Sequence, residues 1–121
     1  MLDHISLYVK NLDDAKKFYS AALAPLGYEI AHEGEGFLGM GEPGKPDLWI
    51  SEEPEKAKPA HVAFQADDRT KIDAFYTAAL SAGGKDNGKP GPRDNYGPNY
   101  YAAFVFDGEG NNIEVVCHKP A

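Results

Sequence analysis

Two histidines and one glutamate stand out in the sequence as side chains that could bind a metal ion together. His4 begins the segment HISLYV, His61 begins HVAFQA, and Glu114 lies in the closing segment NNIEVVCH. Two imidazoles and one carboxylate suit Zn(II), Ni(II), Co(II), Mn(II) or Fe(II), and they leave coordination positions open. Such an ion can polarise the oxygens of a bound molecule. The three residues therefore predict one divalent metal ion as a cofactor.

An internal duplication relates the two histidines. The segment 4–9 matches 61–66, and FYSAAL (18–23) matches FYTAAL (75–80), with both matches 57 residues apart (61 − 4 and 75 − 18). Gly27 falls on Gly84 at the same offset. The two histidines thus occupy equivalent points of two tandem copies.

Each copy has the pattern of one strand, one helix and three further strands. Alternating apolar residues predict a strand at the start of each copy, and apolar residues at i, i+3, i+4 and i+7 predict the helix that follows. Asn11 and Asp68 are the expected N-caps. Glycine-separated strands complete the copies, at 28–32, 36–40 and 47–51, then at 84–87, 100–106 and 111–117.

These elements predict an α+β fold, in which two tandem βαβββ modules form a curved eight-stranded sheet around a groove. The chain 1–121 is expected to be one domain, with modules at 1–51 and 59–119 and a polar linker between them. Alternation places His4 and His61 on the face opposite the aliphatic side chains. Glu114 alternates with Ile113 and Val115, so it also points away from the helices and into the groove.

Composition limits the classes of partner and compartment. The chain is 42% hydrophobic and 26% charged, as in a globular protein, and its net charge of −7 disfavours nucleic acid. No window approaches ~18 uninterrupted apolar residues, so no membrane segment is expected. Cys117 is the only cysteine, which rules out an intrachain disulfide and favours a reducing cytoplasm.

The paired modules, the FY-x-A-A-L helices and the segment NYYAAFVFDGEGNNIEVVCH (99–118) resemble the vicinal oxygen chelate superfamily. This superfamily includes glyoxalase I, extradiol dioxygenases, fosfomycin-resistance proteins and bleomycin-binding proteins. The resemblance implies metal ligands on the first and fourth strand of each module, which carries over to His4, His61 and Glu114. It also implies that Glu114 is catalytic and that the protein forms a homodimer.

The fourth ligand position departs from that pattern. If Leu48 and Ile50 match the buried Ile113 and Val115, Trp49 occupies the place where a glyoxalase I has its second glutamate. Asp47 lies on the same face and would take that place only if the strand shifted by two residues. Without the second carboxylate, the expected general base of a glyoxalase I is missing.

The long segment 88–99 has no counterpart of equal length in the first copy, and such loops often border binding sites. Arg93 could grip a carboxylate or phosphate, or it could simply be a solvated loop residue. Tyr100 and Tyr101 are neighbours in a strand, so only one of them can reach the groove. The expected substrate contacts are Trp49, Arg93, Tyr96, Asn99, Tyr100, Tyr101, Tyr8 and Gln65.

Together these features predict a metal-dependent, glyoxalase-like lyase, isomerase or transferase. Its substrate would be a small molecule that chelates the metal through vicinal oxygens. Two alternatives remain open: an extradiol-type dioxygenase, and a non-catalytic drug- or metabolite-binding protein of the bleomycin-resistance type.

Overall fold

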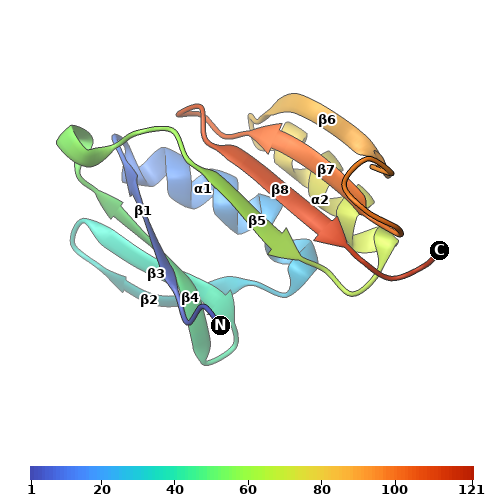
Figure 1. The fold of residues 1–121 in the computed structure, drawn as a ribbon. Helices are drawn as coiled ribbons and strands as arrows, with labels where there is room; N and C mark the ends of the chain where they lie inside the picture. The colour runs from blue at the N-terminus through green and yellow to red at the C-terminus, as the bar shows by residue number, and fades with distance from the viewer.

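Two βαβββ modules follow one another in the computed structural model, which describes residues 1–121 (Figure 1). The first consists of β1 (Ile5–Val9), α1 (Leu12–Ala22), β2 (Glu29–Gly34), β3 (Phe37–Glu42) and β4 (Lys45–Glu52). The second consists of β5 (His61–Gln65), α2 (Arg69–Ser81), β6 (Lys85–Pro92), β7 (Tyr101–Phe106) and β8 (Asn112–Cys117). The α+β class and the tandem modules predicted from the sequence are confirmed.

The eight predicted strands are present, and they are shared equally between two sheets. The strand orders are β1-β4-β3-β2 and β5-β8-β7-β6, so both modules have the same topology. In each sheet the first and fourth strands pair in parallel and the other pairs are antiparallel. This pairing brings the first strand of each module, with its histidine, beside the fourth.

The strand register confirms how the two modules correspond. Trp49 of β4 pairs with Ser6 of β1, and Glu114 of β8 pairs with Ala63 of β5. Ser6 and Ala63 are equivalent in the duplication, since 63 − 6 is again 57. Trp49 therefore occupies the position in the first sheet that Glu114 occupies in the second, and the two-residue shift considered for Asp47 does not occur.

The helices cover one face of the two sheets and leave the other face open (Figure 1). Asn11 and Asp68 cap the helices as predicted, because their side chains accept hydrogen bonds from the backbone N–H groups of Asp14 and Lys71, both at 3.0 Å. One continuous apolar core contains residues of both modules, including Leu7, Ile50, Phe64 and Val115. No helix is long and apolar enough to cross a membrane.

The segment 88–99 differs from its predicted form as one long loop. Its first part belongs to β6, which continues to Pro92. The register of β6 against β7 shifts around Gly88 and again before Gly91. Glycine allows such bulges, and proline is tolerated because β6 is an edge strand. An irregular edge strand lacks the alternation by which strands are predicted from sequence.

Candidate functional site

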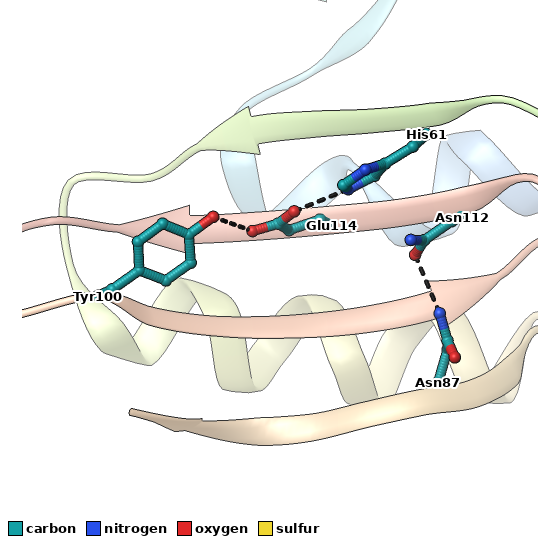
Figure 2. Close-up of polar contacts among 5 residues, drawn as sticks. All are labelled: His61, Asn87, Tyr100, Asn112 and Glu114. Atoms are coloured by element: carbon teal, nitrogen blue, oxygen red, sulfur yellow. Dashed lines mark hydrogen bonds and ion pairs between the residues drawn. The ribbon is translucent and has the colours of Figure 1, made fainter. Parts of the chain in front are cut away.

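A hydrogen-bonded group of three side chains lies on the open face of the second sheet (Figure 2). His61 Nε2 lies 2.8 Å from Glu114 Oε1, and the Tyr100 hydroxyl donates to Glu114 Oε2 at 2.5 Å. Glu114 is only 2% exposed, because these neighbours cover it. β8 lies between β5 and β7; His61 is the first residue of β5 and Tyr100 directly precedes β7, so these two strands bring their side chains to opposite sides of Glu114.

A second polar pair continues this face toward the other end of the strands. Asn87 Nδ2 donates to Asn112 Oδ1 at 3.1 Å, and Asn112 pairs in register with His61 (Figure 2). Neither asparagine was predicted as a site residue. Asn112 could have been found from the sequence, because it alternates onto the same face as Glu114; Asn87 could not, because β6 is irregular.

Tyr100 is a hydrogen-bond donor at neutral pH. Burial, together with the hydrogen bond and the negative charge of Glu114, raises the pKa of Tyr100 to about 12. The ring makes edge contacts with Tyr96 and His118, with ring centroids 5.3 and 5.2 Å away. The hydroxyl of Tyr100 thus stays protonated and directed at the carboxylate.

His4 lies apart from this group. It precedes β1, its side chain is 53% exposed, and Nδ1 lies 2.7 Å from the Asp3 carboxylate. His4 and His61 nevertheless line one cavity of about 320 Å³, to which Tyr28, Asp47 and Gln65 also contribute. The structure brings two of the three predicted ligands into contact, and it arranges no three His, Cys, Asp or Glu residues to hold a metal ion.

Asp47 lies in a β-bulge of β4 and does not pair with a residue of β3. It is the extra residue between the pairs Met40–Leu48 and Gly41–Pro46. The hydroxyl of Tyr28 donates to Asp47 Oδ2 at 2.8 Å, while Oδ1 is buried without a partner. Burial, the hydrogen bond and the charge of Asp47 raise the pKa of Tyr28 well above its usual range. Asp47 therefore forms part of the wall of the cavity between the modules.

Trp49 is the centre of an aromatic cluster on the open face of the first sheet. His32 stacks on it at 5.8 Å and 20° between ring planes, and Phe37 lies at 6.4 Å. A Cβ atom at Gly39 would lie 2.6 Å from the indole, so the indole rests directly on the β3 backbone. We call Trp49, His32 and Phe37 the aromatic platform.

Arg93 is engaged by the protein itself. Its guanidinium donates to the carbonyl oxygens of Lys89 at 2.7 Å and Gly91 at 2.9 Å, and it lies over the Phe104 ring at 5.4 Å. These contacts hold the irregular strand β6 in place. They take up part of the donor capacity of the guanidinium, and a role for Arg93 in binding a carboxylate or phosphate stays a prediction.

The other predicted substrate contacts are spread over several surfaces. Tyr96 lies beside Tyr100 and is 60% exposed. Asn99 has a positive φ of 61° in the turn that precedes Tyr100. Tyr101 turns to the helix side, where its hydroxyl donates to Asp73 at 2.8 Å. Tyr8 lies under the ammonium group of Lys56, and Gln65 lines the cavity between the modules. Tyr100, rather than Tyr101, is thus the tyrosine that reaches the open face.

Comparison with known proteins agrees with this fold. Residues 1–115 match the model of the Glyoxalase/Bleomycin resistance protein/Dioxygenase superfamily. The chain belongs to this family. No curated protein sequence matches it.

Solved structures with the same fold span nearly the whole chain. A glyoxalase/bleomycin resistance protein from Albidiferax ferrireducens T118 is 26% identical, with a TM-score of 0.84 and 99% of each chain covered. A lactoylglutathione lyase from Agrobacterium tumefaciens is 21% identical, with a TM-score of 0.72, over 97% of this chain and 92% of the other. At 21% identity, the second comparison shows a common fold only.

Proposed function

We propose that this protein is a metal-dependent, glyoxalase-like enzyme, a lyase, isomerase or transferase, that acts on a small molecule with vicinal oxygens. The observation that supports this most directly is the buried Glu114 carboxylate, 2.8 Å from His61 Nε2 on an open sheet face. Imidazole and carboxylate are the donors that Zn(II), Ni(II), Co(II), Mn(II) and Fe(II) accept. A bound ion would supply Lewis acidity toward the vicinal oxygens.

His61 and Glu114 are the two neighbouring donors in this proposal, and His4 is the third. The contact between His4 and Asp3 joins two exposed side chains, 53% and 93% accessible, and such pairs contribute little stability. His4 can therefore turn from Asp3 into the cavity that it shares with His61 at small cost. The donor types fit a divalent ion, and completing the set requires this movement.

At the two equivalent strand positions, Glu114 is the single carboxylate. Trp49 stands where a second carboxylate would be equivalent to Glu114, so Glu114 is the proposed catalytic residue as well as a ligand. A glyoxalase I moves a proton between adjacent carbons with a second carboxylate as general base. The first sheet has Trp49 at that position. We expect weak lactoylglutathione lyase activity or none.

The proposal includes a homodimer in the cytoplasm. Each sheet has two edge strands that are paired on one side only, β1 and β2 in one sheet and β5 and β6 in the other. Unpaired edges favour association with a second chain. The single buried cysteine, Cys117, suits a reducing compartment.

A second candidate function is supported by the aromatic platform. The platform gathers the rings of Trp49, His32 and Phe37 on the open face of the first sheet, and clustered aromatic rings are suited to contact with a planar molecule. A non-catalytic protein that sequesters a drug or metabolite would use such a surface. Metal binding separates the two candidates, because sequestration by stacking needs no ion.

Metal content is the decisive measurement. We expect the wild type, incubated with Zn(II), Ni(II), Mn(II) or Fe(II), to retain about one ion per chain in elemental analysis. His61→Ala and Glu114→Gln should lose it, and His4→Ala should weaken it. His32→Ala is the matched control, since His32 lies in the other sheet. A wild type as free of metal as His61→Ala would refute the enzyme proposal and favour sequestration.

An activity panel then tests the reaction class. Methylglyoxal with glutathione tests the glyoxalase reaction, and a set of catechols tests the dioxygenase alternative. Rapid formation of lactoylglutathione by the metal-loaded protein would contradict the role assigned to the Trp49 position.

A further inference from the structure

Tyr100 holds one oxygen of Glu114, and His61 meets the other. The Tyr100 hydroxyl donates to Oε2 at 2.5 Å, whereas His61 Nε2 lies 2.8 Å from Oε1 (Figure 2). We infer that Tyr100 is a positioning residue, which occupies Oε2 so that Glu114 presents Oε1 alone to a metal ion or a reacting proton. The inference rests on the proposed function only for the role of Glu114 as a ligand.

The framework around Tyr100 fixes the hydroxyl in this place. Tyr96 and His118 contact the ring edge to face, with interplanar angles of 78° and 87°. The carbonyl oxygen of Tyr100 accepts a hydrogen bond from the backbone N–H of Arg93 at 2.6 Å. Ring and backbone thus both have fixed neighbours before β7 begins, and turning the hydroxyl away from Glu114 would break the ring contacts.

The hydroxyl is therefore already in use, which changes the role expected for Tyr100 from the sequence. A substrate contact needs a free donor or acceptor on the open face, while a donor to a buried carboxylate orients that carboxylate. Hydrogen bonds to ionised groups are short and strong, so Oε2 is not readily released. With Oε2 held by Tyr100, we expect Glu114 to bind a metal through Oε1.

Outer-sphere partners of this type strongly influence metal sites. Hydrogen bonds to a ligating carboxylate fix its direction, and their removal typically costs about 10–100-fold in metal affinity. In Tyr100→Phe the carboxylate is free to rotate and to bind through both oxygens. We therefore expect a weaker site with a different coordination geometry.

Tyr101 provides a matched control in the next residue. Its hydroxyl also donates to a carboxylate, Asp73, at 2.8 Å, but on the helix side of the sheet. Tyr101→Phe removes the same atom from the same kind of hydrogen bond. It leaves the Glu114 side of the sheet untouched.

The first test uses the metal-free protein. In protein labelled with ¹³C at the glutamate carboxyl groups, Glu114→Gln identifies the Glu114 signal by its loss. We expect Tyr100→Phe to move that signal and Tyr101→Phe to leave it in place. A Glu114 signal that moves no further in Tyr100→Phe than in Tyr101→Phe overturns the inference, whether or not the protein binds metal.

The second test uses added metal. Zn(II) titration should show about 10–100-fold weaker binding for Tyr100→Phe than for Tyr101→Phe. The visible absorption of bound Co(II) should change only in Tyr100→Phe. Equal affinities together with identical Co(II) spectra overturn the inference. If the wild type binds neither ion, the proposed function fails, and the carboxyl signal alone decides the role of Tyr100.

Discussion

One pair of equivalent positions accounts for much of the difference between the open faces of the two sheets. At equivalent positions the second sheet carries Glu114 and the first carries Trp49. The neighbours differ accordingly: Phe104 pairs with Glu114, whereas Gly39 pairs with Trp49. A glycine opposite Trp49 leaves the space that the indole occupies, so the aromatic platform depends on a residue without a side chain.

Gly39→Ala should therefore displace Trp49. The added methyl group would lie 2.6 Å from the indole, inside contact distance, so the ring must move. We expect a loss of about 1–3 kcal/mol in unfolding free energy. The fluorescence of Trp49, the only tryptophan, should shift as well. Gly108→Ala is the control, because a methyl group there meets nothing within 4 Å. Unchanged fluorescence in Gly39→Ala would contradict the close contact between the indole and Gly39.

Residue types alone predicted part of the site. His61 and Glu114 could be paired from the sequence, because strand alternation and the duplication fix their faces. The partners of Tyr100 and Arg93 could not, since a tyrosine or arginine near a turn has many possible contacts. Strand alternation extended back to His4 predicts that it faces the groove, but the pairing of β1 with β4 begins only at Ile5. His4 is therefore free to contact Asp3.

At the scale of elements, the hairpin turn of the second module forms hydrogen bonds with the start of the helix in the first. Glu109, in the turn between β7 and β8, accepts hydrogen bonds from the backbone N–H groups of Lys10 at 2.7 Å and Asn11 at 3.0 Å. Glu52 accepts from the next one, Leu12, at 3.0 Å. The positive end of the α1 dipole is thus met by two carboxylates. The turn of the second module thereby holds the helix of the first.

Glu109→Ala should destabilise the whole chain. It removes the acceptor of two backbone N–H groups, and hydrogen bonds to charged groups contribute about 1.5–3 kcal/mol. We expect a loss of about 1–3 kcal/mol in denaturant unfolding. Glu35→Ala is a close control, since Glu35 also precedes a glycine with positive φ in a hairpin turn, but it is exposed. Equal stability of the two variants would show that the contact with α1 contributes nothing.

Local patterns explain which elements were predictable. The helices and the strands of regular alternation follow from periodicity and from the N-caps Asn11 and Asp68. The end of β6 and the bulge at Asp47 depend on pairing with distant strands, so no local signal marks them. The role of Glu109 could not be predicted locally either, since its hydrogen-bond partners are 98 and 99 residues away in the sequence.

At the scale of the molecule, a buried polar network spans both modules. The hydroxyl of Tyr19, in α1, donates to Asp107 Oδ2 at 2.5 Å, and Asn111 donates to the same oxygen at 2.8 Å. Asn111 in turn accepts from the backbone N–H of Ala60, just before β5. Tyr19 is fully buried and Asp107 is 7% exposed. Because the apolar core is also continuous, we expect the two modules to unfold together.

This network should make the protein less stable as the pH rises in the alkaline range. Burial and the neighbouring charge of Asp107 raise the pKa of Tyr19 well above its usual range, whereas in the unfolded chain it titrates near about 10. Above pH ~10 the unfolded chain therefore releases a proton that the folded protein keeps, and deprotonation favours unfolding. Stability contributed by the protonated Tyr19 is present below pH ~10 and declines as the pH rises above it.

Tyr19→Phe tests this at two pH values. At pH 7 the variant should be less stable by about 1–3 kcal/mol, because the buried Asp107 loses a donor. Between about pH 10 and 12 it should lose less stability than the wild type, because one titrating group is gone. Denaturant unfolding measured at each pH checks both, with Tyr8→Phe as control on the open face. A Tyr19→Phe variant that declines as steeply as the wild type would mean that other groups cause the alkaline loss. Separate transitions for the two halves of the chain in any of these measurements would contradict unfolding as one unit.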